Sequence, residues 1–267
     1  MNGSNVIGQA VGAISEAVRR LTASIATLTT ALLLYVLLLG LVFLFLTTRE
    51  SNVGQVVLGL VVWPLLAVLV FFVAQAFGLV AVQVSQFGIG TGHRLKRALY
   101  DSVKLIIVTL PVMVLASLIL LGVDYLDEQL IGLAPQLNQS QLHWLGRGRA
   151  VLSPAQAVLL WVILPLLTIH CWISVLQAGV WRAIRGAGLI FQRALSPGSI
   201  LVYLLTAGLY LGLAWLLFRV RPAIEREWLE LWLFALRMAL GLLVIFLGWL
   251  LTLGALAVWV VQRESDG

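Results

Sequence analysis

Residues 31–46 read ALLLYVLLLGLVFLFL, an apolar run with no charged side chain. A helix of about 20 apolar residues crosses the hydrocarbon core of a bilayer, and residues 28–47 supply that length. Five more segments have the same character, and they are residues 56–84, 105–123, 157–181, 200–218 and 238–261. Because the runs are continuous rather than alternating, they predict helices, which pair their own backbone groups in lipid, and not the strands of a barrel. The predicted fold is an all-α polytopic membrane protein with six transmembrane helices.

The composition supports this class of protein. Of the 267 residues, 61% are hydrophobic and 10% are charged, and the mean hydropathy is +1.06. Soluble domains carry about 25% charged residues. A soluble enzyme, a disordered chain and a nucleic-acid-binding module are therefore excluded, and no nucleic acid is expected as a partner. The single cysteine excludes a disulfide framework.

The charges between the runs predict an orientation. With the N-terminus in the cytoplasm, Lys and Arg exceed Asp and Glu in the inner segments, whereas the two signs balance in the outer segments. The net charge of +6 then falls on the inner side. The positive-inside rule therefore predicts that both termini are cytoplasmic, in a multi-pass protein of the bacterial inner membrane.

The same pattern predicts how the chain is divided. Residues 1–27 are expected to form an amphipathic N-terminal helix, and residues 28–261 the six-helix transmembrane domain. An outer interfacial loop at residues 124–153 lies within that domain, and residues 262–267 form a short C-terminal tail.

Two stretches of the chain resemble each other. Each has, in order, a Pro-Leu-Leu motif early in a long apolar run, an Arg-Ala-Leu motif and a turn signal. These features lie at residues 62–66, 97–99 and 101–102 in the first copy and at 163–167, 193–195 and 196–199 in the second. We predict a parallel two-helix repeat, about residues 56–123 and 157–218. Chance similarity between Leu-rich segments is the alternative, and the shared order of the motifs favours the repeat.

A seam of apolar residues precedes the first span, at alternating spacings of four and three. It consists of Ile7, Val11, Ile14, Val18, Leu21, Ile25 and Leu28. Such a heptad seam is typical of a helix that packs against another helix. The alternative is a helix lying on the cytoplasmic leaflet, with Arg19 and Arg20 near lipid phosphates. In-plane helices usually carry more basic residues and large aromatics, so we favour packing against a second copy or a partner membrane protein.

Polar side chains inside the spans are the next candidates, since ionisable groups there are costly and often functional. One stripe follows the helical period and consists of His170, Ser174 and Gln177. A second consists of Gln75, Gln83 and Gln86. The stripes either face each other and line a polar path or head-group slot, or form ordinary interhelical hydrogen bonds. We favour the hydrogen bonds, because the spans hold no Asp or Glu for proton-coupled transport.

Basic residues cluster in two predicted cytoplasmic elbows. The first elbow carries Arg94, Lys96 and Arg97, and the second carries Arg182, Arg185 and Arg193. These residues are placed to meet anionic phospholipid head groups or to dock a cytoplasmic subunit. The alternative is that they only set the topology.

The chain contains no recognisable nucleophile motif, phosphate-binding loop or metal-ligand spacing. No catalytic, cofactor-binding or metal-ligating residue is predicted, and the cofactor question stays open. The leading hypothesis is a non-enzymatic membrane subunit or scaffold that assembles with itself, partner chains or anionic lipid. Small residues on the last span, Gly241, Gly248 and Ala255, also suit lateral packing.

The alternative hypothesis is a permease or channel subunit of a transporter. Six spans, an N-terminal amphipathic helix and cytoplasmic termini are similar to the layout of the membrane half of an ABC-type exporter. The similarity covers the layout of the chain and no motif within it. It implies that the basic elbows contact a separate ATPase.

Overall fold

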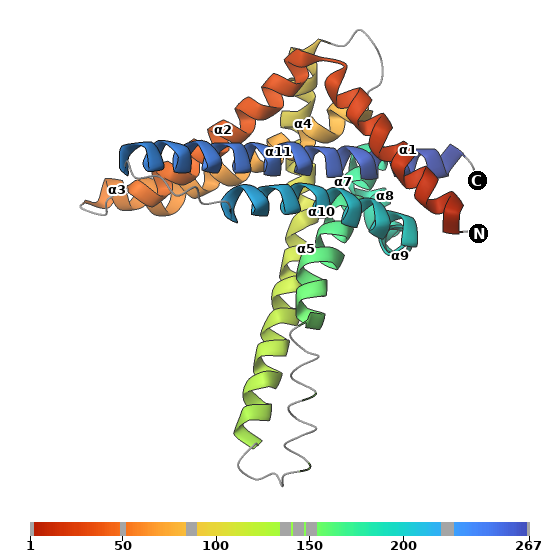
Figure 1. The fold of residues 1–267 in the computed structure, drawn as a ribbon. Helices are drawn as coiled ribbons and strands as arrows, with labels where there is room; N and C mark the ends of the chain where they lie inside the picture. Colours follow the sequence, from red (N-terminus) through yellow and green to blue (C-terminus); the bar gives the residue numbers. More distant parts are fainter. Residues whose placement is uncertain are drawn as a thin grey trace. The chain divides into compact units, whose positions relative to one another are not determined.

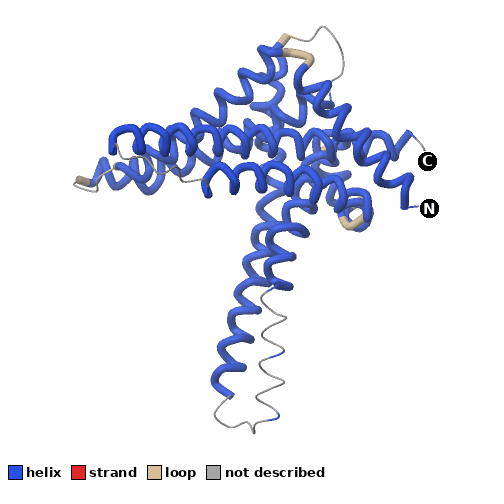
Figure 2. The backbone as a smooth tube through the Cα atoms, viewed as in Figure 1, coloured by secondary structure: helices blue, strands red, loops and turns tan. Residues whose placement is uncertain are grey.

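The computed structural model describes residues 3–48, 52–83, 90–133, 140, 147, 154–219 and 227–265. Almost all of these residues are helical and none of them forms a strand (Figures 1 and 2). Six helices are long and apolar enough to cross a membrane, and they are Ile25–Thr47, Val53–Val82, Thr91–Gln129, Pro154–Ala178, Pro197–Arg219 and Trp228–Arg263. The prediction of an all-α chain with six candidate membrane-spanning helices is confirmed.

The N-terminal segment is split into two helices, α1 (Gly3–Thr22) and α2 (Ile25–Thr47). Ser24 begins α2, because its side-chain oxygen accepts a hydrogen bond of 3.3 Å from the backbone N–H of Thr27. The predicted seam therefore does not follow a single helix. Its last two residues, Ile25 and Leu28, belong to α2.

The second and fourth spans share an unusual backbone feature. A π-helical turn, η1 (Leu58–Val62), connects α3 (Val53–Val57) to α4 (Trp63–Gln83), and another, η3 (Leu159–Ile163), precedes α7 (Leu164–Ala178). Each ends two residues before a proline, Pro64 or Pro165. Proline lacks an N–H and crowds the preceding turn, and a π turn is one way in which a helix accommodates such a disturbance.

The third span lies in α5 (Thr91–Leu133), which is longer than predicted. The turn expected at residues 101–102 is absent, because Asp101 forms ion pairs within the helix, to Lys104 at 2.6 Å and to Arg97 at 3.5 Å. Such pairs at i, i+3 and i, i+4 support a helix. The start of the predicted outer loop, up to Leu133, is helical, and most of the remainder lies outside the described residues.

The chain divides into two compact units. Unit 1 consists of Met1–Leu105 with Pro197–Gly267, and unit 2 of Ile106–Ser196. In unit 1, α10 (Pro197–Arg219) packs along α11 (Glu227–Ser265), and α1, α2 and α4 also take part in the bundle. Its core lies around residues 72–82 of α4 and 252–260 of α11, where every residue is buried.

Unit 2 contains α5 from Ile106 onward, η3 with α7, and the short helices α8 (Val180–Arg185) and α9 (Ala187–Ala194). Gly179 joins α7 to α8 with φ 84° and ψ 164°, a conformation that is essentially restricted to glycine. This turn brings Ala183 and Ile190 against Val108 and Val175 in a small apolar core.

Candidate functional site

One face of α1 is buried within unit 1. Ala10, Ala13 and Ala17 are completely buried, and α1 contacts α11, α10 and α4. A Cβ built on Gly254 of α11 would lie 3.4 Å from the Cβ of Ala17, so the two helices approach closely here. Small side chains permit this approach, as they do in membrane helix pairs.

The predicted seam lies beside that face and is largely uncovered. Ile7 and Val11 are each 55% exposed and Val18 is 44% exposed. Ile14 is half-buried and Leu21 is buried, whereas on α2 Ile25 is exposed and Leu28 is half-buried. Of the seam residues on α1, Leu21 therefore packs within unit 1, whereas Ile7, Val11 and Val18 do not fix α1 to the rest of the unit.

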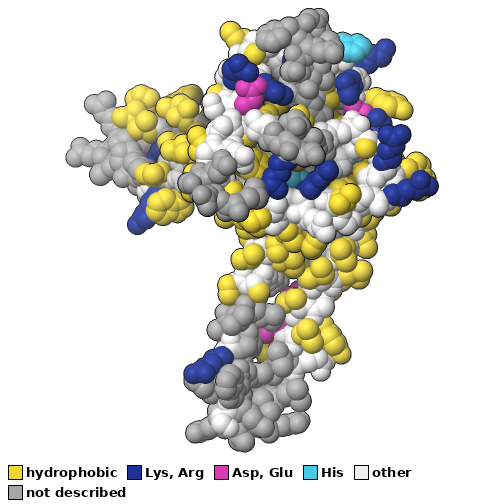
Figure 3. Space-filling view, turned by 90° about the vertical axis from the view of Figure 1, so that its right-hand side faces the viewer, with side chains coloured by type: hydrophobic (Ala, Val, Ile, Leu, Met, Phe, Trp, Pro, Cys, Tyr) yellow, Lys and Arg dark blue, Asp and Glu magenta, His cyan; other side chains and the backbone are white. Residues whose placement is uncertain are grey.

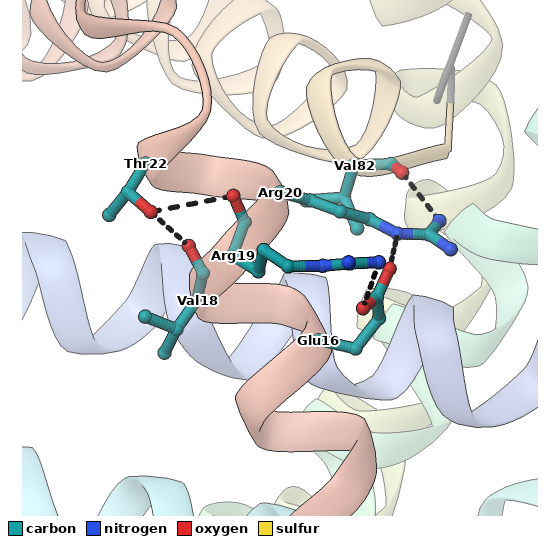
Figure 4. Close-up of polar contacts among 6 residues, drawn as sticks. All are labelled: Glu16, Val18, Arg19, Arg20, Thr22 and Val82. Carbon is teal, nitrogen blue, oxygen red and sulfur yellow. Dashed lines mark hydrogen bonds and ion pairs between the residues drawn. The ribbon is translucent and has the colours of Figure 1, made fainter.

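A polar cluster holds the end of α1 (Figure 4). The Arg20 guanidinium donates to Glu16 Oε1 at 2.7 Å and to the carbonyl oxygen of Val82, near the end of α4, at 3.0 Å. Arg19 pairs with the other Glu16 oxygen at 2.7 Å, but its side chain is 79% exposed. The pKa of the Glu16 carboxyl is lowered from its usual value, mainly by the hydrogen bond from Arg19 and next by the hydrogen bond from Arg20. Arg20 thus serves the contact between α1 and α4.

The predicted stripe on α4 contributes one interhelical hydrogen bond. Trp249 of α11 donates from Nε1 to Gln75 Oε1 at 2.6 Å, and Gln75 is completely buried. Its Nε2 and the hydroxyl of buried Tyr35 make no hydrogen bond with described residues, and the Tyr35 ring stacks on Phe246 at 4.5 Å. The side chains of Gln83 and Gln86 lie outside the described residues.

The stripe on α7 is not uniform. His170 is buried, and its Nε2 has no hydrogen-bond partner among the described residues, whereas Ser174 is half-buried and Gln177 is exposed. The hydrogen bond that does link α7 to α5 comes from Trp172 Nε1 to Thr109 Oγ1 at 2.7 Å. Sequence reasoning missed it, since a lone Trp and a lone Thr carry no spacing signal. Gln75 belongs to unit 1 and His170 to unit 2.

The two basic elbows differ in how their charges are paired. In the first, Arg94 donates to Thr27 Oγ1 at 3.1 Å, Arg97 pairs with Asp101, and Lys96 is exposed. In the second, Arg182, Arg185 and Arg193 are all exposed. Neither Arg182 nor Arg185 forms a hydrogen bond or ion pair with another described residue. The elbows therefore differ, since Arg94 and Arg97 are paired in the first whereas Arg182 and Arg185 have no partner among the described residues.

Among the described residues, no group of His, Cys, Asp and Glu side chains could hold a metal ion. Comparison with protein families, with curated proteins and with solved structures finds no match for this chain. Its six long apolar helices are compatible with an integral multi-pass membrane protein.

Proposed function

We propose that this chain is a non-enzymatic subunit or scaffold of a membrane assembly, and that the seam on α1 binds a second copy of the chain. The observation that carries the proposal is the exposure of Ile7, Val11 and Val18 beside a buried face of alanines. The chain uses its small residues to hold α1 and leaves the heptad seam uncovered.

A second copy is the occupant that the seam fits best. A 3.5-residue repeat of Ile and Val is the stripe of a two-helix seam, and such a stripe complements its own copy across a two-fold axis. The seam of α1 lacks the large aromatic residues that usually accompany a helix lying in lipid. A partner membrane protein and the lipid surface are the competing occupants, which the experiment below distinguishes.

The proposal includes the topology and the internal repeat. Both termini lie in the cytoplasm of a bacterial inner-membrane protein, with the surplus positive charge on the same side. The repeat is supported by the two π turns, since Trp63 N–H bonds to the Leu58 carbonyl and Leu164 N–H bonds to the Leu159 carbonyl, each just before the proline. After the Arg-Ala-Leu motifs the copies differ, because α5 is continuous whereas α9 and α10 are separate helices.

The test introduces charge on the seam. Val11→Asp with Val18→Asp is expected to convert an oligomer into a monomer, because each carboxylate would be desolvated in the seam. The matched control, Gln9→Asp with Gly12→Asp, adds the same charge at exposed positions away from the seam, and no atom lies within 4 Å of a Cβ added at Gly12. Mass measurement of the protein in nanodiscs decides the outcome. A wild-type monomer, or an oligomer that survives the seam variant, would overturn the proposal.

A second candidate function is the permease subunit of a transporter. It is favoured by α8 and α9, which are short helices separate from the spans and carry exposed arginines, as an element that contacts a cytoplasmic ATPase would. An ATPase that copurifies with the wild-type chain, and is lost from Arg182→Gln with Arg185→Gln, would support this function over the scaffold.

A further inference from the structure

Unit 2 contains a partly open cavity of about 340 Å³, within the range of small-ligand sites. Its walls come from α5, from η3 with α7, and from α8 with α9. Representative lining residues are Pro111 and Ala116 on α5, Leu160 and Cys171 on η3 and α7, and Ile184 and Ala187 at the α8–α9 end. Hydrophobic side chains also gather on the visible surface of the α5–α7 pair (Figure 3).

The lining favours a hydrocarbon occupant. Every described side chain that lines the cavity is apolar except the Cys171 thiol. Apolar cavities do not hold water, since water there lacks the two to four polar partners that it needs. A cavity of this kind between membrane helices is suited to an acyl chain.

The charge carried by α8, next in sequence to the lining residues Ala183 and Ile184, indicates the head group. Ile184 lines the cavity, and Arg182 and Arg185 flank it on α8. This helix follows directly after the candidate span that ends at Ala178, so we expect it at the membrane surface. Trp181, which is 77% exposed, precedes the arginines, and tryptophan is typical of the head-group level.

We propose that unit 2 binds an anionic phospholipid, with an acyl chain in this cavity and the phosphate at Arg182 and Arg185. Arg94 and Arg97 of the first elbow have partners within the chain, whereas these two arginines have none among the described residues. The inference specifies the lipid partner of the proposed scaffold. Lipid binding in unit 2 does not require assembly through α1. The oligomer measurement therefore tests the scaffold proposal, and the lipid measurement tests this inference separately.

The experiment uses the full chain in nanodiscs that contain either phosphatidylglycerol or phosphatidylcholine with a photoreactive acyl chain. Crosslinks mapped by mass spectrometry are expected in residues 107–119 and 159–171, and mainly with phosphatidylglycerol. A basic residue near an anionic surface favours binding about fivefold, so two arginines predict a preference of about 30-fold. Equal labelling by both lipids, or no labelling of these segments, would overturn the proposal.

Matched variants separate a specific site from general surface charge. Arg182→Gln with Arg185→Gln is expected to remove the preference for phosphatidylglycerol, and Arg182→Lys with Arg185→Lys to retain most of it. Lys96→Gln with Arg97→Gln removes the same charge from the other elbow and is expected to leave the preference intact. If both glutamine pairs reduce the preference for phosphatidylglycerol equally, or if neither pair reduces it, Arg182 and Arg185 do not form the phosphate site.

A third variant tests the cavity. Ala116→Phe is expected to reduce acyl crosslinking in residues 159–171 because the ring occupies the space that Ala116 leaves open. The matched control is Ala155→Phe, at an exposed position of the same unit that does not line the cavity. Undiminished crosslinking in the folded Ala116→Phe protein would show that the chain lies elsewhere. Capture of a cytoplasmic protein by the arginines, without any lipid preference, would also count against the proposal.

Discussion

The last span and the N-terminal helix both carry a stripe suited to helix packing, and the chain uses the two stripes differently. On α11, Gly241 and Gly248 lie against Phe218 and Tyr210 of α10, so this stripe is occupied within unit 1. On α1 the alanines pack within the unit, and the larger residues of the seam remain mostly exposed. At these two helix contacts small residues allow the close packing within unit 1, whereas Ile7, Val11 and Val18 of the seam are exposed.

The largest effect is expected at Gly248. A Cβ at this position would overlap the Cβ of Tyr210, which cannot rotate away because it is attached to the backbone. Gly248→Ala is therefore expected to destabilise the fold by about 3 kcal/mol, the upper end of ordinary overpacking. The melting temperature in detergent measures the loss.

The control for Gly248 is Gly212→Ala on the facing helix, where no atom lies within 4 Å of the added methyl group. It is expected to leave the melting temperature unchanged or to raise it slightly, because alanine favours helix. Equal melting temperatures for the two variants would contradict the packing of α10 on α11 described above.

The next effect concerns the polar contact inside the unit 1 core. Gln75→Leu removes the acceptor of the Trp249 N–H and is expected to cost about 1–2 kcal/mol. Adding Trp249→Phe removes the orphaned donor as well, so the double variant is expected to lose less than the sum of the two single variants. Additive losses in thermal unfolding would show that the hydrogen bond contributes nothing.

The third effect concerns the attachment of α1. Arg20→Gln removes bonds to Glu16 and to the Val82 carbonyl, and we expect a loss of about 1 kcal/mol because the pair is only partly buried. Arg19→Gln removes a pair whose arginine side chain is 79% exposed, so a smaller effect is expected. Hydrogen exchange of the α1 backbone reports both changes. Similar exchange rates in the two variants would show that Arg20 contributes no more than Arg19 to the attachment of α1.

Much of the fold was predictable because hydropathy is a local property of the chain. The six spans follow from runs of apolar residues, as in residues 31–46, and need no knowledge of partners. The helix break before α2 depends on one side-chain cap, at Ser24, and the absence of a turn at Asp101 depends on ion pairs within α5. Both were missed because a single polar residue is equally compatible with a turn, a cap or a helix.

The site residues were predictable only in part. The heptad spacing indicated the seam of α1 but gave no sign that the neighbouring alanines would be buried. A search for apolar periodicity depends mainly on large side chains, and alanine contributes little to it. The partner of Gln75 lies far away in the sequence, on α11, and no local pattern indicates it. The arginines of α8 have no partner among the residues that the structure describes, whereas Arg94 and Arg97 do, and such partners depend on tertiary structure.

The smallest effect is the most direct test of the comparison. Val11→Ala and Val18→Ala shorten exposed side chains, so each is expected to change the stability of the single chain by less than about 0.5 kcal/mol. Ala13→Val enlarges a completely buried residue on the same helix and is expected to cost about 1–3 kcal/mol. Unfolding is measured under conditions in which the protein is monomeric. If the seam variants destabilise the monomer as much as Ala13→Val does, the seam serves the chain's own fold, and no second copy is needed to explain it.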